Sequence, residues 1–214
     1  MPHTDLVAPA ADAAASAPDL LHDLDRQLSV LICLAPSLPG VTAAALRRRV
    51  APLRARLDDL GGHPFLLVVP GLAAADLLVG AARMGGKAGF TTMERDDLAL
   101  FRPRPDVLLP DAPAYLLVDP DTGRDFLDVP PEQALPGIVA AGRTPMTLDE
   151  GLCWALQDDG LLRSRTCFSM LASRCGDRRV PALWVSKNRP RLGWCWDGAP
   201  HTWLGSASAA SRIG

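Results

Sequence analysis

Apolar residues near the start of the chain recur at the spacing of a helix. Asp19 can cap a first helix, whose apolar positions form one stripe that continues to Ile32. Thr42 can cap a second helical stretch that reaches Leu60. Pro52 interrupts this second stretch, because proline removes a helical hydrogen bond, and a Gly-Gly pair ends it. The pattern therefore predicts two neighbouring helices before any strand.

Two short, continuous apolar runs in the middle of the chain predict buried strands, Phe65–Val69 and Ala114–Val118. A turn rich in Asp, Pro and Gly follows the second run and leads into residues 126–129, which we expect to pair back as a hairpin. Helical patterns occupy the segments between and after these runs. They are predicted at 73–84, behind a Thr-x-x-Glu capping box at 91–94, at 131–141, and behind a second capping box at 147–150.

The last part of the chain changes to short apolar or alternating runs that are separated by Gly, Pro and Asp. Such runs predict strands, here at residues 168–172, 180–186, 191–196 and 202–206. Lys187–Pro190 has the composition of a hairpin loop. Because helices and two buried strands come first and an antiparallel sheet comes last, the predicted fold class is α+β.

Composition limits the organisation and the class of protein. The 214 residues fit one domain, which we place at residues 19–210, after a tail at 1–18 whose Ala, Pro and Asp content predicts disorder. The net charge of −2 argues against nucleic acid as a partner. The chain shows no secretory signal and no apolar run of the roughly 18 residues that a membrane span needs, so we expect a cytoplasmic protein without a membrane partner.

The candidate chemistry gathers between Cys167 and Ser208, which hold four of the five tryptophans and three of the five cysteines. Trp194 and Trp196 lie two apart and share one face of a strand, and we expect Trp184 to lie across the hairpin from them. Tryptophan faces can stack a planar or cationic group, and arginine can hold a carboxylate or phosphate. A ligand-binding site is therefore predicted, made of Arg178, Arg179, Trp184, Trp194 and Trp196.

Three other interpretations of this segment stay open. Cys175 can act as a nucleophile with His201 as base and Asp177 as its orienting group, because the neighbouring arginines would lower the thiol pKa. Zinc is a further possibility, since thiolate and imidazole suit a tetrahedral site, although no CxxC pair is present. The zinc set would be Cys167, Cys175, Cys195 and His201. In the third interpretation the tryptophans are simply hydrophobic core.

The run SRCGDRRVPALWVSKNRPRLGWCW, followed by PHTWLGSAS, resembles the C-terminal signature of an uncharacterised family from high-GC Gram-positive bacteria. Earlier segments such as AYLLVDPDTGRDFLDV and GRTPMTLDEG fit the same family. The resemblance implies a single domain and carries no activity with it. From the residues, the leading expectation is a domain that binds a small ligand or a protein partner. A cysteine-dependent acyl or group transferase is the alternative.

Overall fold

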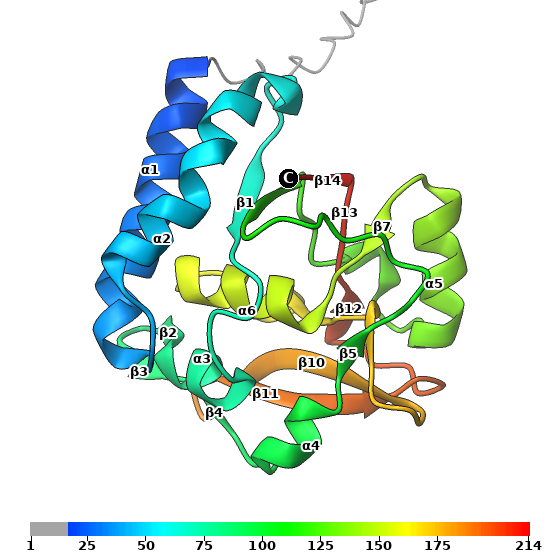
Figure 1. Cartoon of the computed structure of the whole chain (residues 1–214). Coiled ribbons are helices and arrows are strands. Elements are labelled where there is room, and N and C mark those ends of the chain that lie inside the picture. Colours follow the sequence, from blue (N-terminus) through cyan, green and yellow to red (C-terminus); the bar gives the residue numbers. More distant parts are fainter. Residues whose placement is uncertain (1–16) are drawn as a thin grey trace, which may run out of the picture.

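The computed structural model describes residues 17–214 (Figure 1). Most of the predicted tail lies outside the described residues, and its last two residues already belong to the first helix, α1 (Ala17–Leu34). Helices dominate the N-terminal part and mainly antiparallel sheets the C-terminal part. The α+β fold class is therefore confirmed. Among the described helices, none combines the length and the apolarity that crossing a membrane requires.

The N-terminal helices form as the apolar stripe predicts. The helix α2 (Ala43–Val50) is capped by Thr42, whose side chain accepts a hydrogen bond from the backbone of Ala45 at 3.1 Å. At the predicted interruption the chain continues as a 3₁₀ helix, η2 (Ala51–Leu60), with the proline in its first turn. In Figure 1, α1 and α2 lie side by side along one flank of the molecule. Buried leucines of α1 and η2 pack against the smaller of the two main sheets.

That smaller sheet has the order β1-β6-β14 and is antiparallel throughout. Its strands are β1 (Phe65–Val68), β6 (Tyr115–Val118) and the C-terminal β14 (Ser211–Ile213). The expected hairpin of residues 126–129 with β6 is wrong, because β1 and β14 already occupy both edges of β6. The chain forms a short 3₁₀ turn, η3 (Arg124–Phe126), instead.

The larger sheet has five strands in the order β12-β8-β10-β11-β4, with β8, β10 and β11 antiparallel. The strands are β4 (Phe90–Thr91), β8 (Cys167–Ser169), β10 (Arg179–Ser186), β11 (Arg189–Trp196) and β12 (Leu204–Ser206). The predicted β10–β11 hairpin is confirmed. Its turn needs only Lys187 and Asn188, whose φ angles of 53° and 56° are those of a two-residue hairpin turn.

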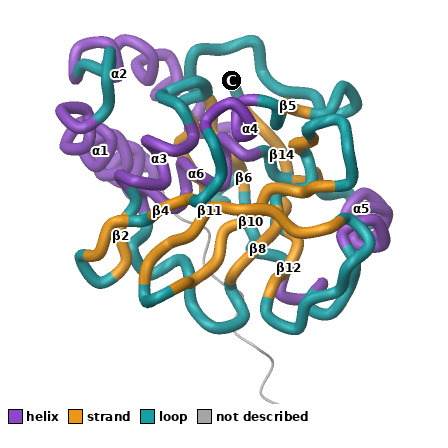
Figure 2. Tube along the Cα trace, turned by 90° about the horizontal axis from the view of Figure 1, so that it is seen from below, coloured by secondary structure: helices purple, strands orange, loops and turns teal. Residues whose placement is uncertain are grey.

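Helix α6 (Leu148–Gln157) is the central element of the fold and lies between the two main sheets (Figure 1). Its predicted capping box is confirmed, with Thr147 and Glu150 each accepting from the other's backbone. The opposite face of the larger sheet is covered by α5 (Pro131–Ala140), which contributes Ala134 and Ile138 to a second buried cluster. Figure 2 shows α5 at the β12 end of that sheet.

Short elements connect these parts. They are α3 (Ala75–Ala81), α4 (Arg95–Ala99), β2 (Arg83–Met84), β3 (Lys87–Ala88), β5 (Arg102–Pro103), β7 (Thr144–Pro145), β9 (Ser173–Arg174) and β13 (Ser208–Ala209). The predicted capping box before α4 does not form. Thr91 belongs to β4 and its hydroxyl accepts from Met93, whereas Glu94 stands at the N-cap without a side-chain cap.

Candidate functional site

The register of the β10–β11 hairpin decides how its tryptophans are placed. Trp194 lies opposite Pro181, and Trp184 lies opposite Arg191. Cross-strand partners share a face and successive residues alternate, so Trp194 and Trp196 project from one face and Trp184 from the other. The rings of Trp194 and Trp196 meet edge to face at 4.9 Å. The prediction that this pair shares a face is confirmed, and the placement of Trp184 across from it is wrong.

Trp184 is held in position by a glycine on the neighbouring strand. A Cβ atom at Gly193 would lie 2.3 Å from the Trp184 ring, so only glycine leaves room for the indole there. The guanidinium of Arg191 stands 5.2 Å from the centre of the ring. Trp203 meets Trp184 edge to face at 6.0 Å, and the His201 ring lies 5.3 Å from Trp203. These contacts bring residues from β10, β11 and the segment before β12 together.

Trp184, His201 and Trp203 lie together at a cavity of about 300 Å³, which we call the tryptophan cavity. It is lined by Ala182, Trp184, Trp194, Cys195, Trp196, Ala199, His201, Trp203 and Leu204. No lysine, arginine, aspartate or glutamate occurs among these lining residues of the described chain. Trp194, Trp196 and Trp203 remain 37%, 52% and 41% exposed, although large aromatic side chains usually find cover in a folded protein.

The two predicted arginines lie outside this cavity. Arg178 donates to the carboxylate of Glu132, which belongs to α5, at 2.9 Å. Arg179 donates to Asp177 at 2.8 Å and stands 6.0 Å from the ring of Trp194. The structure thus divides the predicted tryptophan–arginine site into an aromatic cavity and a separate set of surface ion pairs.

Cys175 and His201 are not brought together as a catalytic pair. The Cys175 thiol donates to Asp177 at 3.2 Å and lines a different cavity from His201. Burial raises the pKa of Cys175, and the hydrogen bond to Asp177 raises it further. The expected lowering of the pKa of Cys175 by neighbouring arginines is therefore wrong, since the nearby Arg179 pairs with Asp177 and its effect on the thiol is smaller.

The zinc set does not assemble either. Within residues 17–214, no group of three or more His, Cys, Asp or Glu side chains is arranged to hold a metal ion. Cys167 and Cys195 stand on β8 and β11 with β10 between them, and both are buried. Cys195 lies 3.4 Å from the hydroxyl of Ser169, and burial raises the pKa of both thiols. These cysteines are part of the hydrophobic core.

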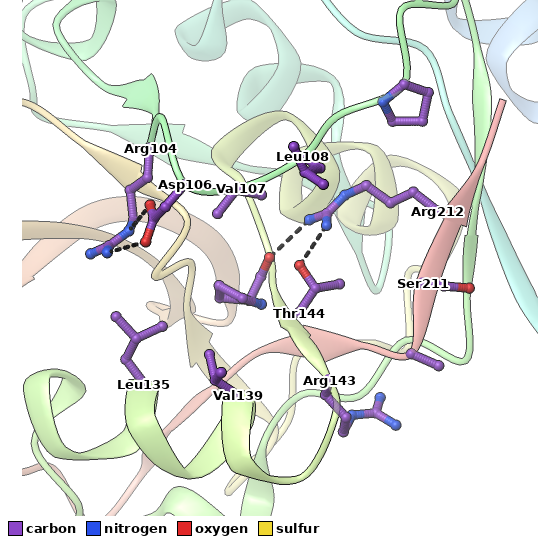
Figure 3. A pocket seen from close by; sticks show the side chains of 13 residues that line it. Arg104, Asp106, Val107, Leu108, Leu135, Val139, Arg143, Thr144, Ser211 and Arg212 are labelled. Carbon is purple, nitrogen blue, oxygen red and sulfur yellow. Dashed lines mark hydrogen bonds and ion pairs between the residues drawn. The ribbon is translucent and has the colours of Figure 1, made fainter.

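A buried polar network, which no local sequence pattern predicts, lies beneath the smaller sheet. Glu150, fully buried, accepts from Tyr115 at 2.8 Å and from Arg212 at 2.5 and 2.9 Å. Arg212 also donates to Thr144 and Pro145 and forms part of the wall of a groove of about 470 Å³ beside α5 (Figure 3). The Thr-x-x-Glu box pointed to Glu150 as a helix cap, but its pairing with a residue 62 positions away has no local signal.

The comparisons with known proteins show to which family the chain belongs. Residues 30–214 match a family model described as a family of unknown function, DUF5701. Because the match covers most of the chain, the chain belongs to that family, and the resemblance to an uncharacterised family is confirmed. The search of curated proteins finds no match, and neither does the search of solved structures.

Proposed function

We propose that this chain is a small-ligand-binding domain whose tryptophan cavity takes an organic cation, such as a quaternary ammonium group. The observation that carries the proposal is a cavity of about 300 Å³ at which the rings of Trp184, Trp203 and His201 meet, without a charged side chain of fixed sign in its lining. This volume is at the lower end of the range for small-molecule pockets, roughly 300 Å³ and above. A compact group the size of choline fits it better than an extended ligand.

The chemistry of the wall favours a cation over an anion. Indole rings carry negative charge on their faces, and each face in contact with a cation contributes about 0.5 to 2 kcal/mol, with the larger value for desolvated contacts. Trp184 and Trp203 meet at an interplanar angle of 61°, so the two rings form a corner rather than a flat platform. A corner of this kind surrounds a compact, roughly spherical group from two sides.

An anion would find little in the cavity to replace its hydration. Arg178 is paired with Glu132, and Arg179 is paired with Asp177, so neither guanidinium is directed into the cavity. The Cys195 thiol in the wall stays neutral at physiological pH, because burial raises its pKa. An organic cation, in contrast, loses a weakly held hydration shell and gains the aromatic faces.

We also propose that the protein is cytoplasmic and comes from a high-GC Gram-positive bacterium. All five cysteines are unpaired, and free thiols are typical of a reducing compartment, which supports the cytoplasm. The resemblance to a family from high-GC Gram-positive bacteria supports that origin. Purification without reductant, followed by thiol counting, tests the first of these: a disulfide formed quantitatively in cells would contradict it.

Tryptophan fluorescence during a titration with choline chloride tests the binding proposal, with sodium chloride at equal ionic strength as the reference. We expect a saturable change in emission, and about tenfold weaker binding for Trp203→Leu, because one aromatic contact is lost. Trp154→Phe is the matched control. Trp154 packs against Phe168 in the core, 5.7 Å between ring centres, and does not line the cavity.

Two results would contradict the proposal. Emission that follows choline chloride and sodium chloride equally would mean that no cation site exists. Equal choline affinities of the wild type and Trp203→Leu would mean that binding occurs elsewhere, provided that Trp154→Phe also binds normally.

A further inference from the structure

We propose that a second cavity binds a phosphate monoester through three arginines. This cavity of about 550 Å³ lies beside the β5–β9 ladder and includes Arg102, Arg104 and Arg174 in its lining. It shares no lining residue with the tryptophan cavity, so the two proposals stand independently. We call it the arginine cavity.

The arginines are brought together by strand pairing. Arg102 lies directly opposite Arg174 in the antiparallel register of β5 and β9. The backbone of Arg104 donates to Ala172 at 2.8 Å and so continues the ladder, two residues beyond Arg102 and on its side. Like charges directly opposite one another in a ladder destabilise it. The fold thus holds three guanidinium groups near one another against their mutual repulsion.

The carboxylates nearby compensate two of the three charges. Arg104 forms a pair of hydrogen bonds with Asp106, at 2.9 and 2.7 Å, which Figure 3 shows at the border of the neighbouring groove. Arg174 donates to Asp197 at 3.1 Å. Arg102 is exposed, and within the described part of the chain no carboxylate lies at ion-pair distance from it.

Arg102 therefore lines this cavity without a direct ion pair among the described residues, although its charge acts on Asp149, where burial raises the pKa of the carboxyl and the charge of Arg102 lowers it. Burial lowers the pKa of Arg174, and the charge of Arg104 lowers it further, against the opposing effect of Asp197. An anion bound in the cavity would offset this repulsion between Arg104 and Arg174. The positive charge of the arginines thus favours an anionic ligand in this cavity.

The ligand class follows from the donors and from the rim. Guanidinium groups match phosphate oxygens with paired hydrogen bonds, and a phosphate offers three terminal oxygens to donors from several directions. Leu100, Pro103 and Pro105 add an apolar side to the same cavity. Apolar side chains gain no contact from inorganic phosphate, but they can pack against the organic part of a phosphate monoester.

Calorimetric titration of the full chain with phenyl phosphate and with inorganic phosphate tests the proposal, at an ionic strength held constant with sodium chloride. We expect phenyl phosphate to bind more tightly than inorganic phosphate. Arg102→Gln should weaken phenyl phosphate binding roughly tenfold or more, because a charge-assisted contact is lost. Arg48→Gln, at an exposed position of α2 far along the chain from the cavity, is the matched control and should bind as the wild type does.

A second readout distinguishes a binding residue from a merely structural one. Without phosphate, Arg102→Gln should unfold at the same urea concentration as the wild type or at a higher one, because the repulsion with Arg174 is relieved. Equal phenyl phosphate affinity in Arg102→Gln and the wild type would overturn the proposal, as would an equal loss in Arg48→Gln. Inorganic phosphate binding as tightly as phenyl phosphate would overturn the assignment to a monoester.

Discussion

The buried ion pair between Arg212 and Glu150 offers a sharp test of how the core is held together. The side chains are 5% and 0% exposed, and Glu150 also accepts from Tyr115 and from the backbone of Thr147. In the variant Arg212→Met the apolar volume is roughly kept, but the carboxylate loses its only cationic partner among the described residues. The variant must then either bury an unpaired charge or protonate it.

Two routes give the size of the effect. Removing one partner of a buried pair typically costs about 3 to 5 kcal/mol. Protonating a glutamate that is ionised in the unfolded chain costs about 1.4 kcal/mol for each pH unit above about 4.3, which is roughly 3.7 kcal/mol at pH 7. The two estimates agree. For a domain of this size the midpoint of thermal unfolding should fall by about 6 to 20 °C.

Urea denaturation of the wild type and Arg212→Met at about pH 7 and pH 5 measures this cost. The stranded carboxyl is neutral in the folded variant and ionised in the unfolded chain, so the variant loses stability as pH rises. The difference from the wild type should therefore shrink by about 2.7 kcal/mol between pH 7 and pH 5. The double variant Arg212→Met/Glu150→Gln should recover most of the loss at pH 7. A loss below about 1 kcal/mol, or one that is equal at both pH values, would contradict this origin of the destabilisation.

Two further predictions concern the cysteines and the hairpin glycine. Mass spectrometry during alkylation at about pH 8 should find the exposed Cys33 modified first, Cys175 more slowly because burial and its hydrogen bond to Asp177 raise its pKa, and Cys153 only on unfolding, since burial raises the pKa of Cys153 to about 12. Fast modification of Cys175 at neutral pH would contradict the geometry. Gly193→Ala should cost about 1 to 3 kcal/mol in urea denaturation and abolish the choline response, because its Cβ would displace the indole 2.3 Å away. Unchanged stability and response would contradict that placement.

Local patterns predicted much of the fold, because each of the elements concerned is specified by its own residues. The apolar run of β1, the capping box of α6 and the turn of the β10–β11 hairpin all formed where the sequence indicated. Strands of two or three residues, such as β4 and β14, are too short for periodicity to predict. For that reason β14 was missed as a partner of β6, and a local hairpin was expected in its place.

The candidate site was predictable only in part, for a similar reason. Strand alternation sufficed to pair Trp194 with Trp196, since both lie on β11. The meeting of Trp184 with Trp203, and the pairing of Arg178 with Glu132, depend on how distant segments pack. These tryptophans and Arg178 lie close together along the chain. In the structure they lie on two faces of the sheet and contact different neighbours.

The proposed function requires that the tryptophan cavity recognises the positive charge of its ligand. Calorimetric titration with choline and with its neutral analogue, in which carbon replaces the quaternary nitrogen, measures that charge directly at nearly constant shape. We predict that choline binds with one site per chain and about tenfold or more tighter than the neutral analogue. Equal affinities, or tighter binding of the neutral analogue, would show a merely hydrophobic cavity and contradict the claim.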